Sequence, residues 1–184
     1  MPKGLNKRKC KNCGLVFQKK TPLQFVCSVS CSIEYAKKQR EKKKKKDWNK
    51  RKAEIKQSLK TKQDYEKELE ALFNKFIRLR DAGKPCISCG TSLSGKFDAG
   101  HYYPAGSYKN IRFDEMNVHG QCVHCNQHKH GNITEYTLRL PERIGKESFD
   151  QLVLDRLKER HYTIPELIEL KVIYKDKIKK YDRK

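Results

Sequence analysis

The chain has 184 residues, of which 36% are hydrophobic and 35% are charged, and its formal net charge is +21. So few apolar residues exclude one large core and favour small modules joined by charged helices. No apolar run approaches the roughly 18 residues of a membrane-spanning helix, and residues 1–7 lack the apolar segment of a secretory signal. We therefore expect a cytoplasmic protein whose partner is a polyanion and not a membrane.

All eight cysteines fall into four close pairs, which in a reducing compartment indicate metal ligands before disulfides. The first two pairs lie within residues 1–35 and predict a zinc module of two cysteine-bearing turns joined by a short hairpin. So small a unit would draw most of its folding free energy from the metal. A redox role for the first pair is the alternative, but no βαβ pattern surrounds it. The expected zinc ligands are Cys10, Cys13, Cys27 and Cys31.

Residues 36–83 are expected to form a basic helical linker followed by an amphipathic helix. From Ser32 to about Lys62 the sequence permits a helix, but its crowded lysines repel one another, so we expect phosphates to order it. A solvated linker is the alternative structure. A membrane-surface helix would show a large apolar face, and Trp48 is the one large apolar residue between Lys37 and Lys52. The expected DNA contacts are Lys42, Lys43, Lys44, Lys45, Lys46, Lys50, Arg51 and Lys52.

A second helix is predicted to follow directly. Thr61 and Asp64 match a capping box, and Gly83 is suited to the residue just beyond the helix end. Between them the apolar residues recur at helical spacing, so we interpret this stripe as core packing and not as a ligand site. The stripe consists of Tyr65, Leu69, Leu72, Phe73, Phe76 and Leu79.

Residues 84–140 carry the third and fourth cysteine pairs. The spacing of Cys86-x-x-Cys89 and Cys122-x-x-Cys125 predicts a second structural zinc site with four thiolates. Between the pairs we expect a strand over 96–103, a loop, and a second strand that leads into Cys122. A helix over about 123–130 would follow. A strand, a loop, a strand and a helix held together by zinc form a ββα-metal finger.

Three residues in this region resemble the signature of the HNH nucleases. They are His101, then Asn117 five residues before the last cysteine pair, and then Asn126 directly after it, as in endonuclease VII-like members. The stretches 98–102, 117–122 and 131–132 resemble more closely the NinG (Rap) recombination proteins of lambdoid phages. This resemblance covers most of the chain. It implies a DNA endonuclease that leaves 5′-phosphate and 3′-hydroxyl ends.

The residue types suit that chemistry. Phosphodiester hydrolysis needs an activated water and relief of charge on the leaving oxygen. A neutral imidazole is usable as a general base near pH 7, which gives His101 that role. In the HNH family a backbone carbonyl holds the other ring nitrogen, and the residue matching Asn117 positions that carbonyl. The resemblance further implies one Mg²⁺ or Mn²⁺ ion, for which Asn126 offers an amide oxygen.

The metal site leaves one question open. Many HNH sites have an acidic ligand directly before the base, and here that position is Gly100. Asp98 would serve if Gly100 kinks or bulges the strand. His130, one helical turn beyond Asn126, is the other candidate. The expected phosphate contacts of this module, for which a solvated surface is the alternative, are Lys109, Arg112 and Lys129.

Residues 141–184 show two helical patterns. One runs from Ser148 to about Arg160, and the other begins at Thr163, where Thr163 and Glu166 match a capping box. We expect these helices to pack against the core and to follow phosphates. The chain as a whole is therefore expected to be an α+β protein of small zinc modules: an N-terminal four-cysteine unit, a basic helix, an HNH-type finger and C-terminal helices.

Three functions are compatible with these features. The first is a structure-selective endonuclease for Holliday junctions or D-loops, and this selectivity rests on the NinG resemblance alone. The second is a general HNH endonuclease of restriction or packaging type. The third is a non-catalytic zinc protein that binds nucleic acid. Symmetric cleavage of a junction needs two active sites, so the first function also predicts a homodimer. Host or phage recombination proteins are further expected partners.

Overall fold

The computed structural model describes residues 7–182. By their contacts the residues divide into two compact units between Lys60 and Thr61. This division falls inside the expected 36–83 segment because the two helices of that segment differ in burial. The first has no buried residue, whereas the second belongs to the core of the second unit. No helix over residues 7–182 is long and apolar enough to cross a membrane.

The first unit contains a small hairpin and a long helix. Strands β1 (Lys7–Lys9) and β2 (Val16–Gln18) pair antiparallel on either side of the first cysteine pair. The hairpin therefore encloses the first cysteine turn. The sequence had instead predicted a hairpin that joins the two cysteine turns, and this prediction is wrong. The reason is local, because Cys10 N donates to Leu15 O at 2.8 Å and Gly14 N donates to Cys10 O at 3.0 Å. These bonds close the chain tightly around Cys10–Cys13.

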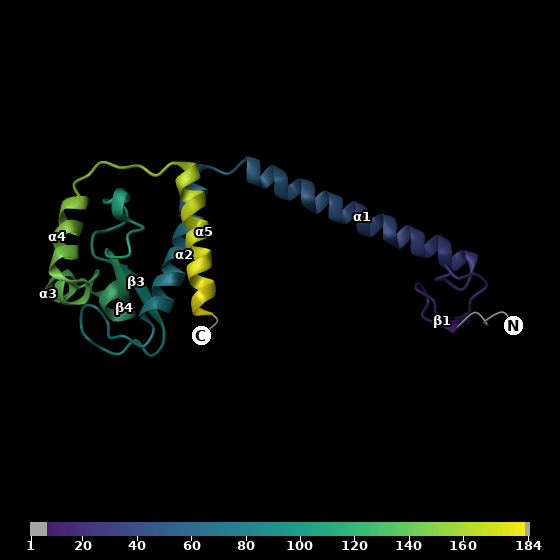
Figure 1. Ribbon diagram of the computed structural model, residues 1–184, viewed down its shortest axis with the longest axis horizontal. Helices are drawn as coiled ribbons and strands as arrows, with labels where there is room; N and C mark the ends of the chain where they lie inside the picture. The colour runs from purple at the N-terminus through teal and green to yellow at the C-terminus, as the bar shows by residue number, and fades with distance from the viewer. Residues whose placement is uncertain (1–6, 183–184) are drawn as a thin grey trace. The chain divides into compact units, whose positions relative to one another are not determined.

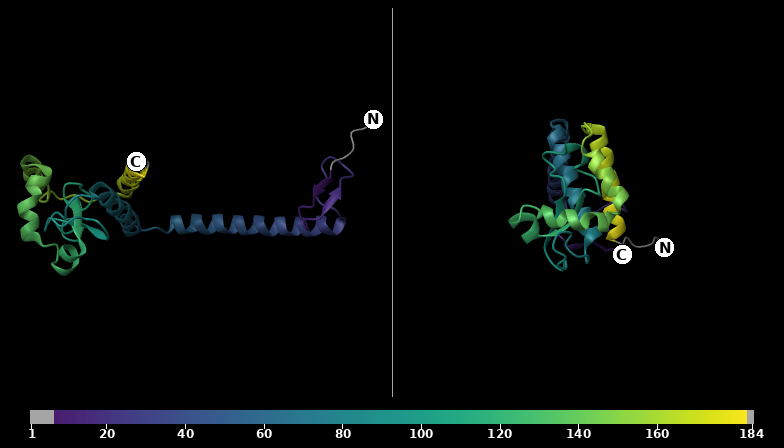
Figure 2. Two further views of the ribbon diagram at one scale, coloured as in Figure 1. Left: turned by 90° about the horizontal axis from the view of Figure 1, so that it is seen from below. Right: turned by 90° about the vertical axis from the view of Figure 1, so that its left-hand side faces the viewer.

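Helix α1 (Val29–Ser58) is continuous over 30 residues, which confirms the helix and not the solvated linker (Figure 2). It begins earlier than expected because the hydroxyl of Ser28 accepts a hydrogen bond from Cys31 N at 3.2 Å and caps it. The fourth cysteine therefore lies in its first turn. None of its residues is buried, so all of its basic side chains are presented to solvent.

The second unit is built around the hairpin of β3 (Phe97–His101) and β4 (Val118–Cys122). Figure 1 shows α2 (Lys62–Asp81) and α5 (Ile164–Tyr181) side by side on one side of it. Helices α3 (Ile133–Ile144) and α4 (Lys146–Asp155) lie on the other side. Each helix pair has its own hydrophobic cluster, and the predicted stripe of α2 is at the centre of the first. The expected α+β architecture with two four-cysteine clusters is confirmed.

The helix ends follow the expected capping rules. Both capping boxes are present, at Thr61 with Asp64 and at Thr163 with Glu166. Gly83 follows the last turn of α2 with φ of 78°, a left-handed conformation that glycine adopts without a steric penalty.

The expected helix over 123–130 is wrong in length. It is a single π-type turn over His124–His128. Helix formation stops there because His130, Gly131 and Asn132 all have positive φ, a conformation that a right-handed helix does not contain. The chain then enters α3, which the sequence analysis did not predict.

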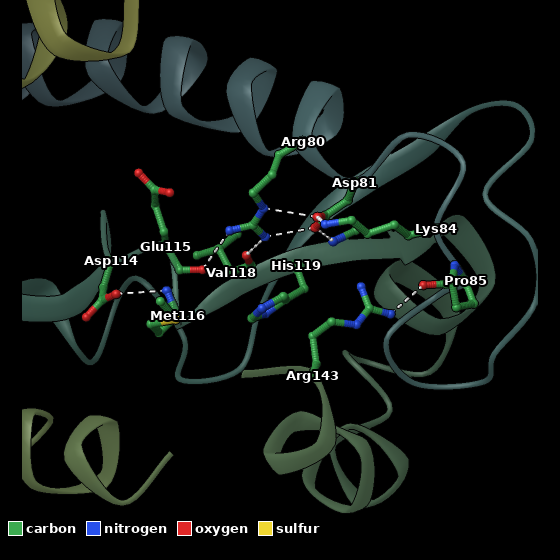
Figure 3. Close-up of polar contacts among 12 residues, drawn as sticks. Arg80, Asp81, Lys84, Pro85, Asp114, Glu115, Met116, Val118, His119 and Arg143 are labelled. Carbon is green, nitrogen blue, oxygen red and sulfur yellow. Dashed lines mark hydrogen bonds and ion pairs between the residues drawn. The ribbon is translucent and has the colours of Figure 1, made fainter. Parts of the chain in front are cut away.

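A buried carboxylate fastens α2 to the hairpin (Figure 3). Asp81 is 0% exposed and accepts hydrogen bonds from Arg80, Lys84 and the backbone N of Gly120. Arg80 in turn donates to the carbonyls of Glu115 and Val118. Burial alone would raise the pKa of Asp81, but the bonds and charge of Arg80, the Gly120 amide and Lys84 lower it from 3.8 to about 2. The C-terminal end of α2 is therefore fixed directly to β4.

Replacing Asp81 with asparagine is expected to destabilise the fold by about 3 kcal/mol at pH 7, because Arg80 and Lys84 lose their anion. Since the folded pKa lies below the unfolded value, the charge contributes about 2 kcal/mol above pH 4 and loses it as the pH falls towards 2. Urea unfolding of the zinc-loaded proteins at pH 7, where the thiolates keep the metal, measures the destabilisation. Asp176→Asn, at an exposed pair with Lys179, is the control and should change stability by less than about 0.5 kcal/mol. A loss of stability at Asp81 no larger than that of the control would contradict the assignment.

Candidate functional site

The second cysteine cluster has the geometry of a zinc site. The four sulfurs lie within 4.8 Å of one another, and Cys89 Sγ is 3.8 Å from Cys122 Sγ. Tetrahedral Zn–S bonds of about 2.3 Å place sulfurs about 3.8 Å apart, so the spacing fits the ion. Three N–H groups point at the sulfurs, namely the amides of Cys122 and Cys125 at 3.4 Å and the Asn132 side chain at 3.6 Å. Such donors stabilise bound thiolates.

The first cluster repeats this arrangement. The sulfur of Cys27 is 3.6 Å from that of Cys13 and 3.5 Å from that of Cys31. Its leading turn also matches that of the second cluster, because Gly14 and Gly90 occupy equivalent positions with φ of 77° and 76°. Each glycine N donates 3.0 Å to the carbonyl of the cysteine four residues earlier. Both clusters are therefore built to hold a metal ion of the zinc type.

His101 stands at the end of β3 with one ring nitrogen fixed. Its Nε2 is 3.0 Å from the carbonyl oxygen of Arg112, so this nitrogen carries the proton and donates it. Nδ1 is then the unprotonated nitrogen. Burial lowers the pKa of His101, although the Arg112 carbonyl and the negative charge of Glu70 oppose part of that effect. The imidazole is therefore neutral at neutral pH.

Asn117 holds the loop that supplies this carbonyl. Its side chain is fully buried, and its Nδ2 donates to Tyr103 O at 3.1 Å and to Ile111 O at 3.2 Å. Its Oδ1 accepts from Tyr103 N at 2.8 Å. The bonds to Tyr103 tie together the two ends of the loop between the strands. The bond to Ile111 holds the residue directly before Arg112. Asn117 therefore positions the carbonyl that orients His101 and does not contact the imidazole itself.

The neighbouring β3 backbone is fixed from the opposite side. Tyr136 of α3 donates its hydroxyl to Gly100 O at 3.2 Å, and His119 Nδ1 lies 3.1 Å from the same hydroxyl. His119 is 3% exposed, and burial with the nearby charge of Arg80 lowers its pKa to about 3. Because Tyr136 donates its own proton to Gly100 O, His119 Nδ1 donates to the Tyr136 hydroxyl oxygen. His119 thereby helps to hold Tyr136 against the backbone of the residue before His101.

A cavity of about 560 Å³ opens beside His101. Asn126 and His130, two of the expected site residues, line it. Two residues of α2, Glu70 and Asn74, complete its wall. The cavity therefore combines two imidazoles with a carboxylate and two amides, and the carboxylate and amide oxygens suit a hard divalent ion.

The comparisons with known proteins agree on one family. A family model described as Bacteriophage Lambda NinG protein matches residues 2–184. The chain belongs to the NinG family. Protein ninG of Escherichia phage lambda is 38% identical over 189 residues, covering 94% of this chain and 92% of the relative. Protein ninG of Salmonella phage P22 is also 38% identical over 189 residues, which cover 94% of this chain and 93% of that relative. No solved structure matches the chain.

Family membership confirms the NinG resemblance that the sequence indicates, and HNH-type chemistry stays a prediction. In this NinG-family chain Asp98 is not among the described residues that line the cavity. Its carboxylate instead accepts hydrogen bonds from Asn126 at 3.1 Å and from Gln127 at 2.8 Å. Asp98 therefore orients the Asn126 amide.

Glycine occupies position 100 for a different structural reason from the expected kink or bulge. β3 pairs residue for residue with β4 through position 100, so the strand has no bulge there that would bring Asp98 to the cavity. A Cβ at Gly100 would lie 2.2 Å from the side-chain oxygen of Gln121. Gln121 in turn donates to Ser88 Oγ, at 2.6 Å, and to the carbonyl of Gly131. Glycine at position 100 leaves room for this buried side chain, which would have to shift to accept a Cβ.

The expected phosphate contacts divide into two groups. The guanidinium of Arg112 is 15% exposed and binds Glu66 at 3.2 Å and Glu70 at 3.0 Å. It fastens the loop to α2, and its expected contact with DNA stays a prediction. The remaining expected contacts are all exposed, as a role in binding phosphate requires: Lys42, Lys43, Lys44, Lys45, Lys46, Lys50, Arg51, Lys52, Lys109 and Lys129.

Glu70 and Asn74 were absent from the sequence-based site. The hydrophobic stripe of α2 led to its interpretation as core alone. The available signal was a second stripe, because Glu66, Glu70 and Asn74 are spaced four residues apart and so share one helix face.

Proposed function

We propose that this chain is a metal-dependent DNA endonuclease that hydrolyses phosphodiester bonds in branched recombination intermediates such as Holliday junctions and D-loops. The observation that carries the proposal is the state of His101. Its Nε2 is bonded to a backbone carbonyl, its Nδ1 is unprotonated, and it borders a cavity lined by oxygen donors. A neutral imidazole fixed in one tautomer is the arrangement that a general base requires.

The proposed chemistry uses few groups. His101 accepts a proton from water through Nδ1 as the water attacks phosphorus, while Nε2 stays on the Arg112 carbonyl. A bound Mg²⁺ or Mn²⁺ relieves negative charge on the leaving oxygen. Asn126 offers it an amide oxygen, because Asp98 already holds the amide nitrogen. His130 is the alternative to Asp98 as a metal ligand, and it lines the His101 cavity. The two zinc ions would be structural, because four thiolates leave no open position.

DNA as substrate is supported by charge. The net charge is +21, and α1 presents its lysines to solvent along its whole length. Phosphates that replace counterions relieve the repulsion among those lysines. The preference for branched DNA rests on the NinG resemblance alone. Symmetric cutting of a junction further implies a homodimer, because each chain carries one His101 cavity.

The test compares a labelled four-way junction, a fork and a linear duplex of the same sequence, each with Mg²⁺, with Mn²⁺ or without a divalent ion. We expect metal-dependent cleavage, with the junction cut at least about tenfold faster than the linear duplex, a difference of about 1.4 kcal/mol in activation free energy. Equal rates would replace the proposal with a general HNH endonuclease. Binding without cleavage under every condition would leave a non-catalytic nucleic-acid-binding protein.

A further inference from the structure

One atom in the His101 cavity lacks the partner that its burial requires. Asn74 Oδ1 is buried and has no hydrogen-bond partner among the described residues. A buried carbonyl oxygen without a partner costs about 1–3 kcal/mol, so native proteins rarely leave one. Asn74 is also one of the residues that line the cavity, so a ligand that binds there is the candidate partner for its side chain.

Glu70 brings a negative charge to the same wall. It lies one helical turn before Asn74 and lines the cavity with His101. Its Oε2 accepts from Arg112 Nη2 at 3.0 Å, and its side chain is 39% exposed. Both residues line the cavity, so the carboxylate and the imidazole border a common space.

Two elements therefore present three oxygen donors to one cavity. Asn126 comes from the turn after the last cysteine pair, while Glu70 and Asn74 come from α2, outside the finger. Carboxylate and amide oxygens are the ligands of Mg²⁺ and Mn²⁺. At Gly100, the position that carries an acidic ligand in many HNH sites, the Gln121 side chain occupies the space that a Cβ would need.

We propose that Glu70 and Asn74 of α2 supply two oxygen ligands to a divalent cation in the His101 cavity, in place of an acidic residue at position 100. The role of this ion in hydrolysis rests on the proposed endonuclease function, whereas its binding does not. Asn126 is the third protein ligand, and water and a DNA phosphate complete the coordination. Asp98 acts on the ion indirectly, by orienting Asn126.

Glu66 provides a matched control for Glu70. Both carboxylates bind the guanidinium of Arg112, at 3.2 Å and 3.0 Å. They face different spaces, because Glu66 lines a separate cavity with Lys62 and Lys109. A residue that acts only by holding Arg112 would behave like Glu66, and a metal ligand would not.

The experiment titrates Mn²⁺ into the zinc-loaded full-length protein without DNA and follows the electron paramagnetic resonance signal of free Mn²⁺. We expect one site in the wild type. Asn74→Ala and Glu70→Gln should each weaken it by about tenfold or more, the scale on which even residues that support ligands act. Asn74→Asp should bind at least as tightly as wild type, because a carboxylate replaces the amide. Glu66→Gln should keep the wild-type affinity.

The inference is overturned if the wild type binds no Mn²⁺, if Asn74→Ala keeps the wild-type affinity, or if Glu66→Gln and Glu70→Gln weaken binding equally. Glu70→Gln and Asn74→Asp conserve side-chain shape, so they keep the test available if Asn74→Ala does not fold. Failure of the proposed function has a different signature. Loss of Mn²⁺ from the two α2 variants, in a protein that cuts no DNA, would support the cation site and reject the endonuclease.

Discussion

His101→Ala is expected to abolish cleavage of four-way junctions while leaving junction binding within about twofold of wild type. Nδ1 of His101 is an unprotonated ring nitrogen, because Nε2 donates to the Arg112 carbonyl, and the ring borders the cavity. Loss of a general base costs about 10²–10⁴-fold in rate. Single-turnover cleavage with Mg²⁺ measures the chemistry, and binding with Ca²⁺ measures the complex. Since burial lowers the pKa of His101 below 6.5, the wild-type rate should already be level by pH 7 and fall in acid.

The matched control is His161→Ala. His161 is exposed and lies after α4, outside the finger, so its removal should leave both cleavage and binding unchanged. A collapse of binding in His101→Ala would assign that residue a structural role instead. Cleavage that survives in His101→Ala would remove the base from the proposed mechanism.

Cys125→Ser and Cys10→Ser are expected to give opposite results, although each should reduce the zinc content by one ion. Cys125 holds the turn that carries Asn126, and its sulfur accepts the Asn132 side chain. Its loss should therefore abolish cleavage altogether. Cys10→Ser should unfold the β1–β2 hairpin and weaken DNA binding, but leave the rate of the bound complex within about threefold of wild type. Zinc content, circular dichroism and single-turnover rates measure these outcomes.

The reason for the difference lies in the two cores. Among described residues before Thr61, the buried hydrophobic side chains are Cys10 and Val26, so a bound zinc would supply nearly all of the folding free energy there. Structural zinc sites contribute about 10–16 kcal/mol in small peptides. The second unit has two larger hydrophobic clusters that do not depend on zinc ligands. A Cys10→Ser protein that loses cleavage in the bound complex would show that the first cluster contributes to the chemistry.

Features encoded over a few residues were predictable from the sequence. Capping boxes, the α2 stripe and the pairing of cysteines depend on local spacing, and the structure contains all three. The strand at His101 and the strand after Asn117 were also placed correctly, because both lie between recognisable cysteine turns. These elements were sufficient to bring His101, Asn126 and His130 to one cavity.

Features that depend on contacts between distant residues were not predictable in this way. Gly100 suggested a distorted strand, whereas its cause is the side chain of Gln121 on the neighbouring strand. Arg112 looked like a free cation until α2 placed Glu66 and Glu70 beside it. The same packing brings Glu70 and Asn74 to the cavity. In each case the deciding neighbour is far away in the sequence, and no local pattern specifies it.

Arg112, in the loop between β3 and β4, contacts His101 with its backbone and α2 with its side chain. Its carbonyl fixes the His101 ring, and its guanidinium is held by Glu66 and Glu70. A fragment beginning at Pro85 would keep every cysteine of the second cluster and all three signature residues. It would nevertheless lack one wall of the cavity, and the loop that aims His101 would lose its anchor. A fragment that is to keep this cavity intact therefore has to begin no later than Thr61, the cap of α2, well ahead of the second cysteine cluster.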